Sequence, residues 1–178
     1  MNPDYYQFLG LPRRLALDSR ELETRFYSLS RKLHPDLFAR KPAAEQAKAL
    51  EESAILNDAF RILRDPVRRA EYVLEAEGLD IGGQSTKDVP AELLEEVFEL
   101  NMALEELRMG DEDAREQLET SRAGFLAARD GIDSAMQSRF AAWDASGDPS
   151  VLAEIRSLLN RRKYVTNLID KANVPDRV

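Results

Sequence analysis

Apolar residues recur at helical spacing along almost the whole chain, and no stretch alternates between apolar and polar residues as a strand would. In the first part, an aspartate at position 18 and a glutamate at position 21 form a capping-box-like pattern that predicts a helix start. The apolar stripe that follows has spacings of four, three and four residues and consists of Leu22, Phe26, Leu29 and Leu33. This pattern predicts an amphipathic helix that ends near residue 33.

Three further helical segments are expected in the same part of the chain. A short aromatic-rich turn covers Pro3 to Leu9, and a fourth helix begins at Pro66, directly after Asp65. The third helix is expected from about Ala43 to Leu63. Its predicted core face consists of Leu50, Ala54, Asn57, Phe60 and Leu63. The predicted core face of the fourth helix consists of Ala70, Val73 and Leu74.

The remaining chain predicts three longer helices with short connections. The first runs from Pro90 to Met109, where Gly110 ends it and Asp111 is available to cap the next helix. The Gly-Asp-Pro sequence at 147–149 ends the middle helix and begins the last one. The predicted core of the middle helix consists of Leu118, Phe125, Ile132, Met136, Phe140 and Trp143. Short connections predict an antiparallel three-helix bundle, so the fold class is all-α.

A stretch rich in glycine and small polar residues separates these two parts. It covers residues 78–87 and predicts a linker between a first domain at 1–77 and a second domain at 88–178. Residues 1–78 carry 13 basic and 13 acidic side chains, whereas residues 79–178 carry 12 and 20. The acidic second domain argues against a nucleic-acid partner and favours a partner protein with a basic surface. The alternative is that the acidic side chains only keep the domain soluble.

The composition excludes several kinds of chemistry. The chain has no cysteine and one histidine, which removes disulfides, thiolate metal ligands, cysteine nucleophiles and histidine-rich metal sites. We expect no cofactor and no bound metal. The N-terminus has no basic and apolar leader pattern, and no apolar run approaches the roughly 20 residues that span a bilayer. We therefore expect a cytoplasmic protein with no membrane partner.

The single histidine lies in the tripeptide His34-Pro35-Asp36, between two predicted helices. One interpretation is a polar tip that is held out for a partner. The other is an ordinary helix end, because a residue before proline avoids the helical conformation and an aspartate stabilises the next turn. The flanking sequence has to decide between them.

The first domain resembles a J-domain, the module with which co-chaperones stimulate DnaK-class chaperones. The resemblance rests on the opening DYYQFLGL at 4–11, the basic helix before His-Pro-Asp, and ILNDAFRIL at 55–63 followed by Asp65-Pro66. The continuation RAEYVL at 69–74 and the acidic helical second domain resemble the HscB type, which serves iron–sulfur cluster biogenesis. The resemblance implies a helical hairpin with a His-Pro-Asp loop, followed by a scaffold-binding bundle.

The resemblance also implies a chaperone-binding surface. Its candidate residues are His34, Pro35, Asp36, Arg25, Arg31 and Lys32. An exposed carboxylate suits pairing with an arginine, proline reduces the entropy lost on docking, and the cations form a positive face toward an acidic chaperone surface. The alternative for the cations is a solvated helix face.

A second surface follows from helical geometry at about 100° per residue. The core stripe of the first bundle helix spans about 80° and consists of Leu93, Val97, Leu100, Leu104 and Leu107. The residues Leu94, Phe98 and Met102 fall outside it, in an acidic frame typical of a docking surface. By resemblance, the IscU-like scaffold would bind Leu94, Phe98, Glu99, Met102 and Glu106. Two alternatives remain: these apolar residues pack on the third bundle helix, or a shift of one position brings Leu93 and Val97 forward.

The predicted function is therefore that of a non-enzymatic co-chaperone. It would stimulate the ATPase of an HscA/DnaK-class chaperone and deliver an IscU-like scaffold, without binding a cluster itself because it has no cysteine. One alternative is a J-domain adaptor for a different client. Another is a small enzyme that uses His34 with Asp36 or a glutamate, which the lack of a second histidine, a cysteine and a phosphate-binding glycine loop disfavours.

Overall fold

A computed structural model of the chain describes residues 3–79 and 93–173. The chain divides into two compact units, unit 1 at 1–79 and unit 2 at 80–178. Within the described residues every regular element is a helix, which confirms the predicted all-α class. Most of the predicted linker at 78–87, and the predicted helix start at Pro90, lie outside the described residues.

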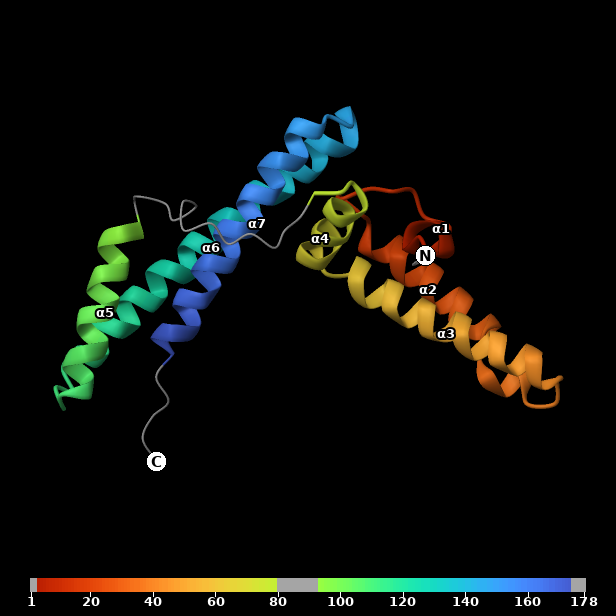
Figure 1. Ribbon diagram of the computed structural model, residues 1–178, viewed down its shortest axis with the longest axis horizontal. Coiled ribbons are helices and arrows are strands. Elements are labelled where there is room, and N and C mark those ends of the chain that lie inside the picture. Colours follow the sequence, from red (N-terminus) through yellow and green to blue (C-terminus); the bar gives the residue numbers. More distant parts are fainter. Residues whose placement is uncertain (1–2, 80–92, 174–178) are drawn as a thin grey trace. The chain divides into compact units, whose positions relative to one another are not determined.

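Unit 1 is built on a helical hairpin. Its elements are α1 (Tyr5–Leu9), α2 (Ser19–Lys32), the 3-10 helix η1 (Pro35–Phe38), α3 (Ala43–Leu63) and α4 (Pro66–Ala76). Helices α2 and α3 run antiparallel with η1 in the loop at one end, and α1 and α4 cover the other end (Figure 1). Aspartate caps begin the helices as predicted: Asp18 accepts from the Arg20 N–H, and Asp65 accepts from the Val67 N–H, both at 2.9 Å.

The buried face of α3 differs from the prediction. Leu50 is 64% exposed, and Ala54 and Asn57 are exposed too, so the predicted core face was wrong at these three positions. The buried residues of α3 are Ala49, Leu56, Ala59 and Leu63. Two of them are alanines, which are less hydrophobic than the exposed Leu50 and therefore indicated the core face less strongly in the sequence.

The other helices of unit 1 follow the predicted pattern more closely. On α4, the predicted residues Ala70, Val73 and Leu74 are all buried. On α2 only Leu22 is fully buried, and the rest of the stripe is half-buried. The half-buried rings still contribute to packing between the helices, because Phe26 of α2 stacks on Phe60 of α3 with ring centroids 4.1 Å apart.

Polar contacts fix the end of unit 1 that lies away from η1. Arg69 is 5% exposed, and its guanidinium donates from Nε to the Leu15 carbonyl at 2.9 Å and from Nη1 to the Leu63 carbonyl at 2.5 Å. The Tyr5 N–H donates to the Tyr72 hydroxyl at 3.1 Å, and burial raises the pKa of that hydroxyl. These bonds connect the loop before α2, the α3–α4 corner and α1.

The described part of unit 2, residues 93–173, contains α5 (Leu94–Arg108), α6 (Ala114–Ser146) and α7 (Pro149–Ala172). Helices α6 and α7 form a long antiparallel hairpin, and α5 packs mainly on α6 (Figure 1). The predicted turn between α6 and α7 is confirmed, because Gly147 has a φ of +63° and Asp148 accepts from the Ser150 N–H at 2.8 Å. The predicted cap of α6 was wrong by two positions. Asp113 occupies the N-cap, and Asp111 accepts from the Asp113 N–H at 3.1 Å.

An apolar seam between the helices forms the core of unit 2. It is built mainly from Leu100, Leu118, Phe125, Ile132, Met136, Phe140, Leu152, Ile155, Leu159, Val165, Leu168 and Ile169. Trp143, predicted in the core, is only half-buried near the end of α6. Polar contacts flank the seam: Arg162 reaches Asp133 at 2.6 Å, and Lys171 reaches the Asn101 side chain at 2.6 Å. None of the described helices is both long and apolar enough to cross a lipid bilayer.

Candidate functional site

The loop between α2 and α3 holds the tripeptide His34-Pro35-Asp36 in a short, defined turn. Helix α2 ends when the Leu33 N–H donates to the Leu29 carbonyl, and His34 then has an extended backbone with φ −61° and ψ 128°. The extended conformation is expected before a proline. Pro35 opens η1, and the Leu37 N–H donates to the His34 carbonyl at 3.0 Å. The loop is therefore shaped by its own backbone.

The side chains of this loop point into solvent. The side chain of His34 is 57% exposed and that of Asp36 is 88% exposed. The histidine Nδ1 lies 3.4 Å from both the N–H and the Oδ2 of Asp36, and these contacts require opposite protonation of Nδ1. The single long contact to Oδ2 holds the carboxylate weakly. The carboxylate is free to accept charge-assisted hydrogen bonds from a partner.

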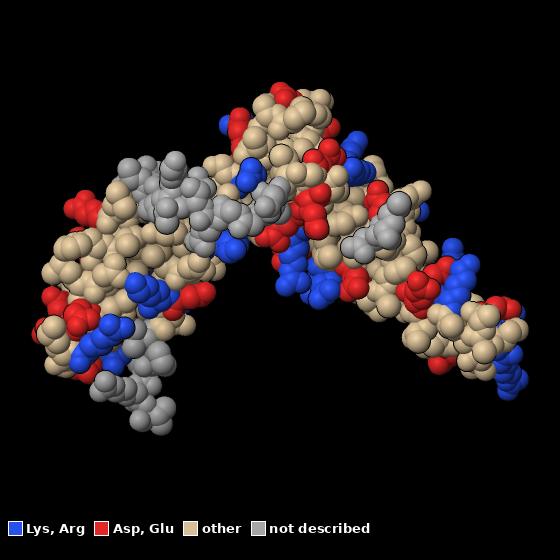
Figure 2. All heavy atoms as spheres, in the orientation of Figure 1, with Lys and Arg blue, Asp and Glu red and all other residues tan. Residues whose placement is uncertain are grey.

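The three candidate cations on α2 are all exposed but do not share one face. At about 100° per residue, Arg25 and Lys32 lie about 20° apart, whereas Arg31 lies about 120° from Arg25. None of the three makes an ion pair with a side chain described in unit 1. Basic side chains are visible around the end of the α2–α3 hairpin in Figure 2. Their charge is thus available to a partner, from two sides of the helix.

Helix α5 exposes the apolar residues that its core stripe leaves out. Leu94 is 57% exposed, Phe98 63% and Met102 47%. The alternative that these side chains pack on the third bundle helix is therefore wrong. Leu93 is buried and Val97 is half-buried, so the alternative register is not seen either.

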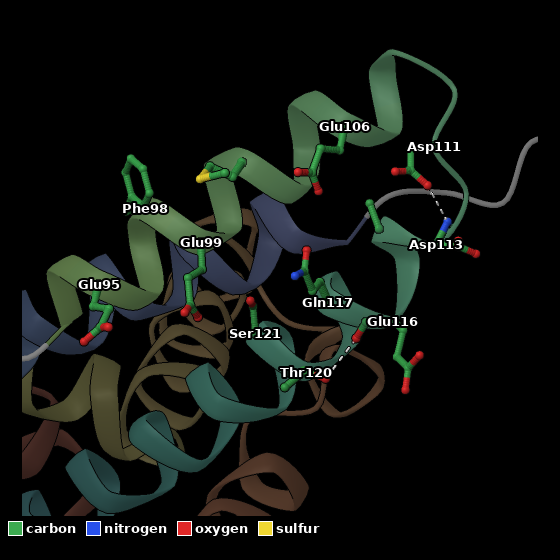
Figure 3. Close-up of a pocket in the computed structure, with 12 residues that line it drawn as sticks. Glu95, Phe98, Glu99, Glu106, Asp111, Asp113, Glu116, Gln117, Thr120 and Ser121 are labelled. Atoms are coloured by element: carbon green, nitrogen blue, oxygen red, sulfur yellow. Dashed lines mark hydrogen bonds between the residues drawn. The ribbon is translucent and has the colours of Figure 1, made fainter.

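Beside this exposed face lies an open groove with a volume of about 850 Å³. It runs between α5 and the first two turns of α6, and the connection between these helices closes one end (Figure 3). Twelve residues line it: Glu95, Phe98, Glu99, Met102, Glu106, Asp111, Asp113, Ala114, Glu116, Gln117, Thr120 and Ser121. Four of the five predicted scaffold-binding residues line this groove, and Leu94 does not.

The groove is strongly acidic. Six of its lining residues are glutamate or aspartate, and no lysine or arginine is among them. The nearby cations pair outside the groove, Arg108 with Glu105 at 3.2 Å and Arg115 with Glu112 at 2.6 Å. Acidic side chains are also visible along α5 in Figure 2. The groove therefore combines negative charge with exposed apolar side chains.

The α6 wall of the groove was absent from the sequence-based site. Its residues include Asp113, Glu116, Gln117 and Thr120. A signal was present, because residues 111–116 contain four acidic side chains directly after the turn at Gly110. An antiparallel return brings them alongside the end of α5, but only the structure shows which of them face it. Within residues 3–79 and 93–173, no group of three or more potential ligands is placed to hold a metal ion.

Comparison with known families identifies the class of the first unit. Residues 4–72 match the DnaJ domain family. This match covers α1 to α3 and the first part of α4, and contains the exposed loop described above. The protein is therefore a J-domain protein.

Solved structures extend the match to both units. Chaperone HscB from Vibrio cholerae matches with a TM-score of 0.68 and 26% sequence identity, covering 96% of this chain and 95% of that chain. The human co-chaperone protein HscB has the same fold, with a TM-score of 0.71, 22% identity and coverage of 96% and 80%. The chain therefore carries a DnaJ domain in unit 1 and is similar to HscB co-chaperones over nearly its whole length.

Proposed function

We propose that this protein stimulates ATP hydrolysis by an HscA/DnaK-class chaperone and delivers an IscU-like iron–sulfur scaffold protein to it. The observation that carries the proposal is the exposed His34-Pro35-Asp36 loop at the end of a J-domain hairpin. The acidic and apolar surface of α5 supports the second half. In this proposal the protein catalyses no reaction itself and works in the cytoplasm.

The loop would act by differential binding. A J-protein that binds one chaperone conformation better than another shifts the chaperone toward that conformation, and the chaperone performs the hydrolysis. The Asp36 carboxylate would pair with a chaperone arginine, and Arg25, Arg31 and Lys32 would attract an acidic chaperone surface. The ring of Pro35 limits the conformational entropy that docking removes.

Substitution Asp36→Asn tests the chaperone half of the proposal. It keeps the shape of the side chain but removes its charge, so stimulation of the chaperone ATPase should be lost while scaffold binding persists. The measurement is single-turnover ATP hydrolysis with and without the J-protein. Asp58→Asn on α3 is a matched control that should stimulate normally. Normal stimulation by Asp36→Asn would refute this half of the proposal.

The double substitution Phe98→Ala with Met102→Ala tests the scaffold half. If these exposed side chains are anchors at the interface, their truncation should weaken scaffold binding by about 2–4 kcal/mol. Calorimetric titration with the scaffold measures this loss. Met109→Ala, which removes a 78% exposed side chain outside the groove, is the control. An unchanged affinity with an unchanged melting curve would mean that this surface binds no scaffold.

A different client remains the competing possibility for the second unit. A pull-down from native cytosol with the intact protein, scored for an iron–sulfur scaffold, separates the two. Recovery of another client in place of a scaffold would leave the J-domain assignment intact and overturn the delivery proposal.

A further inference from the structure

The groove extends beyond the α5 surface on which the proposed scaffold binding rests. Its second wall is the start of α6, where Asp113, Glu116, Gln117 and Thr120 line the same space. Figure 3 shows Glu99 of α5 and Gln117 of α6 directed into the space between the helices, whereas Phe98 projects from the outer side of α5. A bound segment that covers Phe98 and enters the groove would therefore meet both helices.

The dimensions of the groove limit what can occupy it. The α5 wall runs from Glu95 to Glu106, which is about 16 Å at about 1.5 Å per residue. This length accommodates about three turns of a helix, or about five residues of an extended chain at about 3.3 Å each. The groove thus suits a short segment of a protein rather than a flat surface.

Charge specifies the chemistry of that segment. The carboxylates are distributed along the groove, with Glu95, Glu99 and Glu106 on α5, Asp111 and Asp113 in the connection, and Glu116 on α6. None of them forms an ion pair with a side chain described in residues 93–173. An occupant with lysine or arginine side chains would satisfy them, and an apolar side chain would cover Phe98.

We propose that the first two turns of α6 form a second wall of the docking site and that this groove binds a short basic segment of the scaffold protein. The segment places cationic side chains between the α5 and α6 carboxylates and an apolar side chain on Phe98. This inference rests on the proposed function and adds to it the α6 wall and the charge of the bound segment.

Neutralising the α6 wall tests the inference. The wall variant carries Asp113→Asn and Glu116→Gln, and the control carries Glu119→Gln and Asp130→Asn, which remove the same charge from α6 outside the groove. Both are titrated with the IscU-like scaffold at about 50 mM and about 500 mM salt. The wall variant should lose about tenfold in affinity at low salt and differ little from the native protein at high salt, because salt screens the missing attraction. The control should change by less than about twofold at either salt concentration.

A second pair of variants separates binding from folding, because carboxylates in the first turn also stabilise α6 itself. Gln117 lines the wall and is neutral. Gln117→Glu should tighten scaffold binding at low salt, and Gln117→Lys should weaken it. Melting curves of both variants are the control: opposite changes in affinity with unchanged melting curves cannot come from the stability of α6.

The outcomes are distinct. If Phe98→Ala with Met102→Ala weakens binding but the wall and Gln117 variants do not, the inference fails and the proposed function stands. If the control variant loses as much scaffold affinity as the wall variant, the loss comes from the net charge of unit 2 and the inference fails. If the Phe98 and Met102 variant binds normally, the proposed function fails at this surface. Self-association of the native protein that the wall variant abolishes would assign the groove to a second copy.

Discussion

The two units carry their candidate sites in different ways. In unit 1 the candidate site is a loop of a few residues, whose side chains are highly exposed and weakly held. In unit 2 the candidate site extends along about three turns of α5 and the start of α6. A loop site depends on a few atoms, so one substitution can abolish it. A groove site distributes its energy over many side chains, and single changes should therefore give graded effects.

The units also stabilise their helices differently. Unit 1 uses buried polar anchors, with Arg69 bound to two backbone carbonyls. Unit 2 uses a long apolar seam with an ion pair at its edge, between Arg162 and Asp133. The chain has one tryptophan, Trp143 in unit 2, and four of its five tyrosines lie in unit 1. Fluorescence can therefore follow the two units separately.

The largest expected difference in stability is between alanine variants of two leucines on α3. Leu56 is 1% exposed, and Leu56→Ala should destabilise unit 1 by about 3 kcal/mol because it leaves a cavity. Leu50 is 64% exposed, and Leu50→Ala should change stability by less than about 0.5 kcal/mol. Urea unfolding followed by tyrosine fluorescence measures both. A larger loss in Leu50→Ala than in Leu56→Ala would mean that α3 faces the core with the side predicted from sequence.

The next largest effect on stability is expected at the buried Arg69. Arg69→Met fills a similar volume but leaves the Leu15 and Leu63 carbonyls without these donors, which should cost about 2–3 kcal/mol. Tyrosine fluorescence and circular dichroism should register the loss, while the Trp143 transition should not move. Arg68→Met, at an exposed position of the same helix, is the control. An equal shift of the Trp143 transition would contradict the assignment of this anchor to unit 1 alone.

A smaller effect is expected at the ion pair of unit 2. Arg162 makes two contacts with Asp133, at 2.6 and 3.3 Å, and both side chains are partly exposed. Arg162→Met should cost about 1 kcal/mol, measured by urea unfolding with Trp143 fluorescence. The more exposed Arg108–Glu105 pair provides the comparison, and Arg108→Met should cost less than about 0.5 kcal/mol. If the two variants were equal, the bridge between α6 and α7 would contribute no more than a surface pair.

The smallest effect concerns the cap of α7 and depends on pH. Hydrogen bonds from Ser150 lower the pKa of Asp148 below 3.8. The ionised cap therefore stabilises unit 2 fully above pH 3.8 and loses its contribution as the pH falls through the lowered pKa. Asp148→Ala should lower the Tm by a degree or two at pH 7, and this difference should shrink toward pH 2. Asp130→Ala, an exposed mid-helix control, should show no such trend. A difference that persisted unchanged at pH 2 would contradict the role of the charge.

Sequence patterns correctly predicted those helix boundaries that depend only on neighbouring residues. Asp65 before Pro66 and Gly147 before Asp148 placed two helix boundaries correctly, because caps and stops act within a few residues. The face of α3 was mispredicted because Leu50 gave a stronger hydrophobic signal than Ala49, although burial depends on which side meets α1, α2 and α4.

The same distinction separates the two candidate sites. The His34-Pro35-Asp36 loop is contiguous, and its exposure followed from its position between two helices. The groove joins residues of two helices, such as Glu99 and Gln117. Its α5 wall could be predicted from one helical wheel, whereas the α6 wall depends on how closely the helices approach after the turn.

If the loop binds a chaperone as proposed, the proline that opens η1 also affects the rate of binding. Pro35 and the bond from the Leu37 N–H to the His34 carbonyl give the loop its shape before any partner arrives. A surface that needs little rearrangement associates at a rate set by collision and charge attraction. Binding to the chaperone should then proceed in one kinetic phase, linear in chaperone concentration and slower at high ionic strength, with no lag for the loop to form.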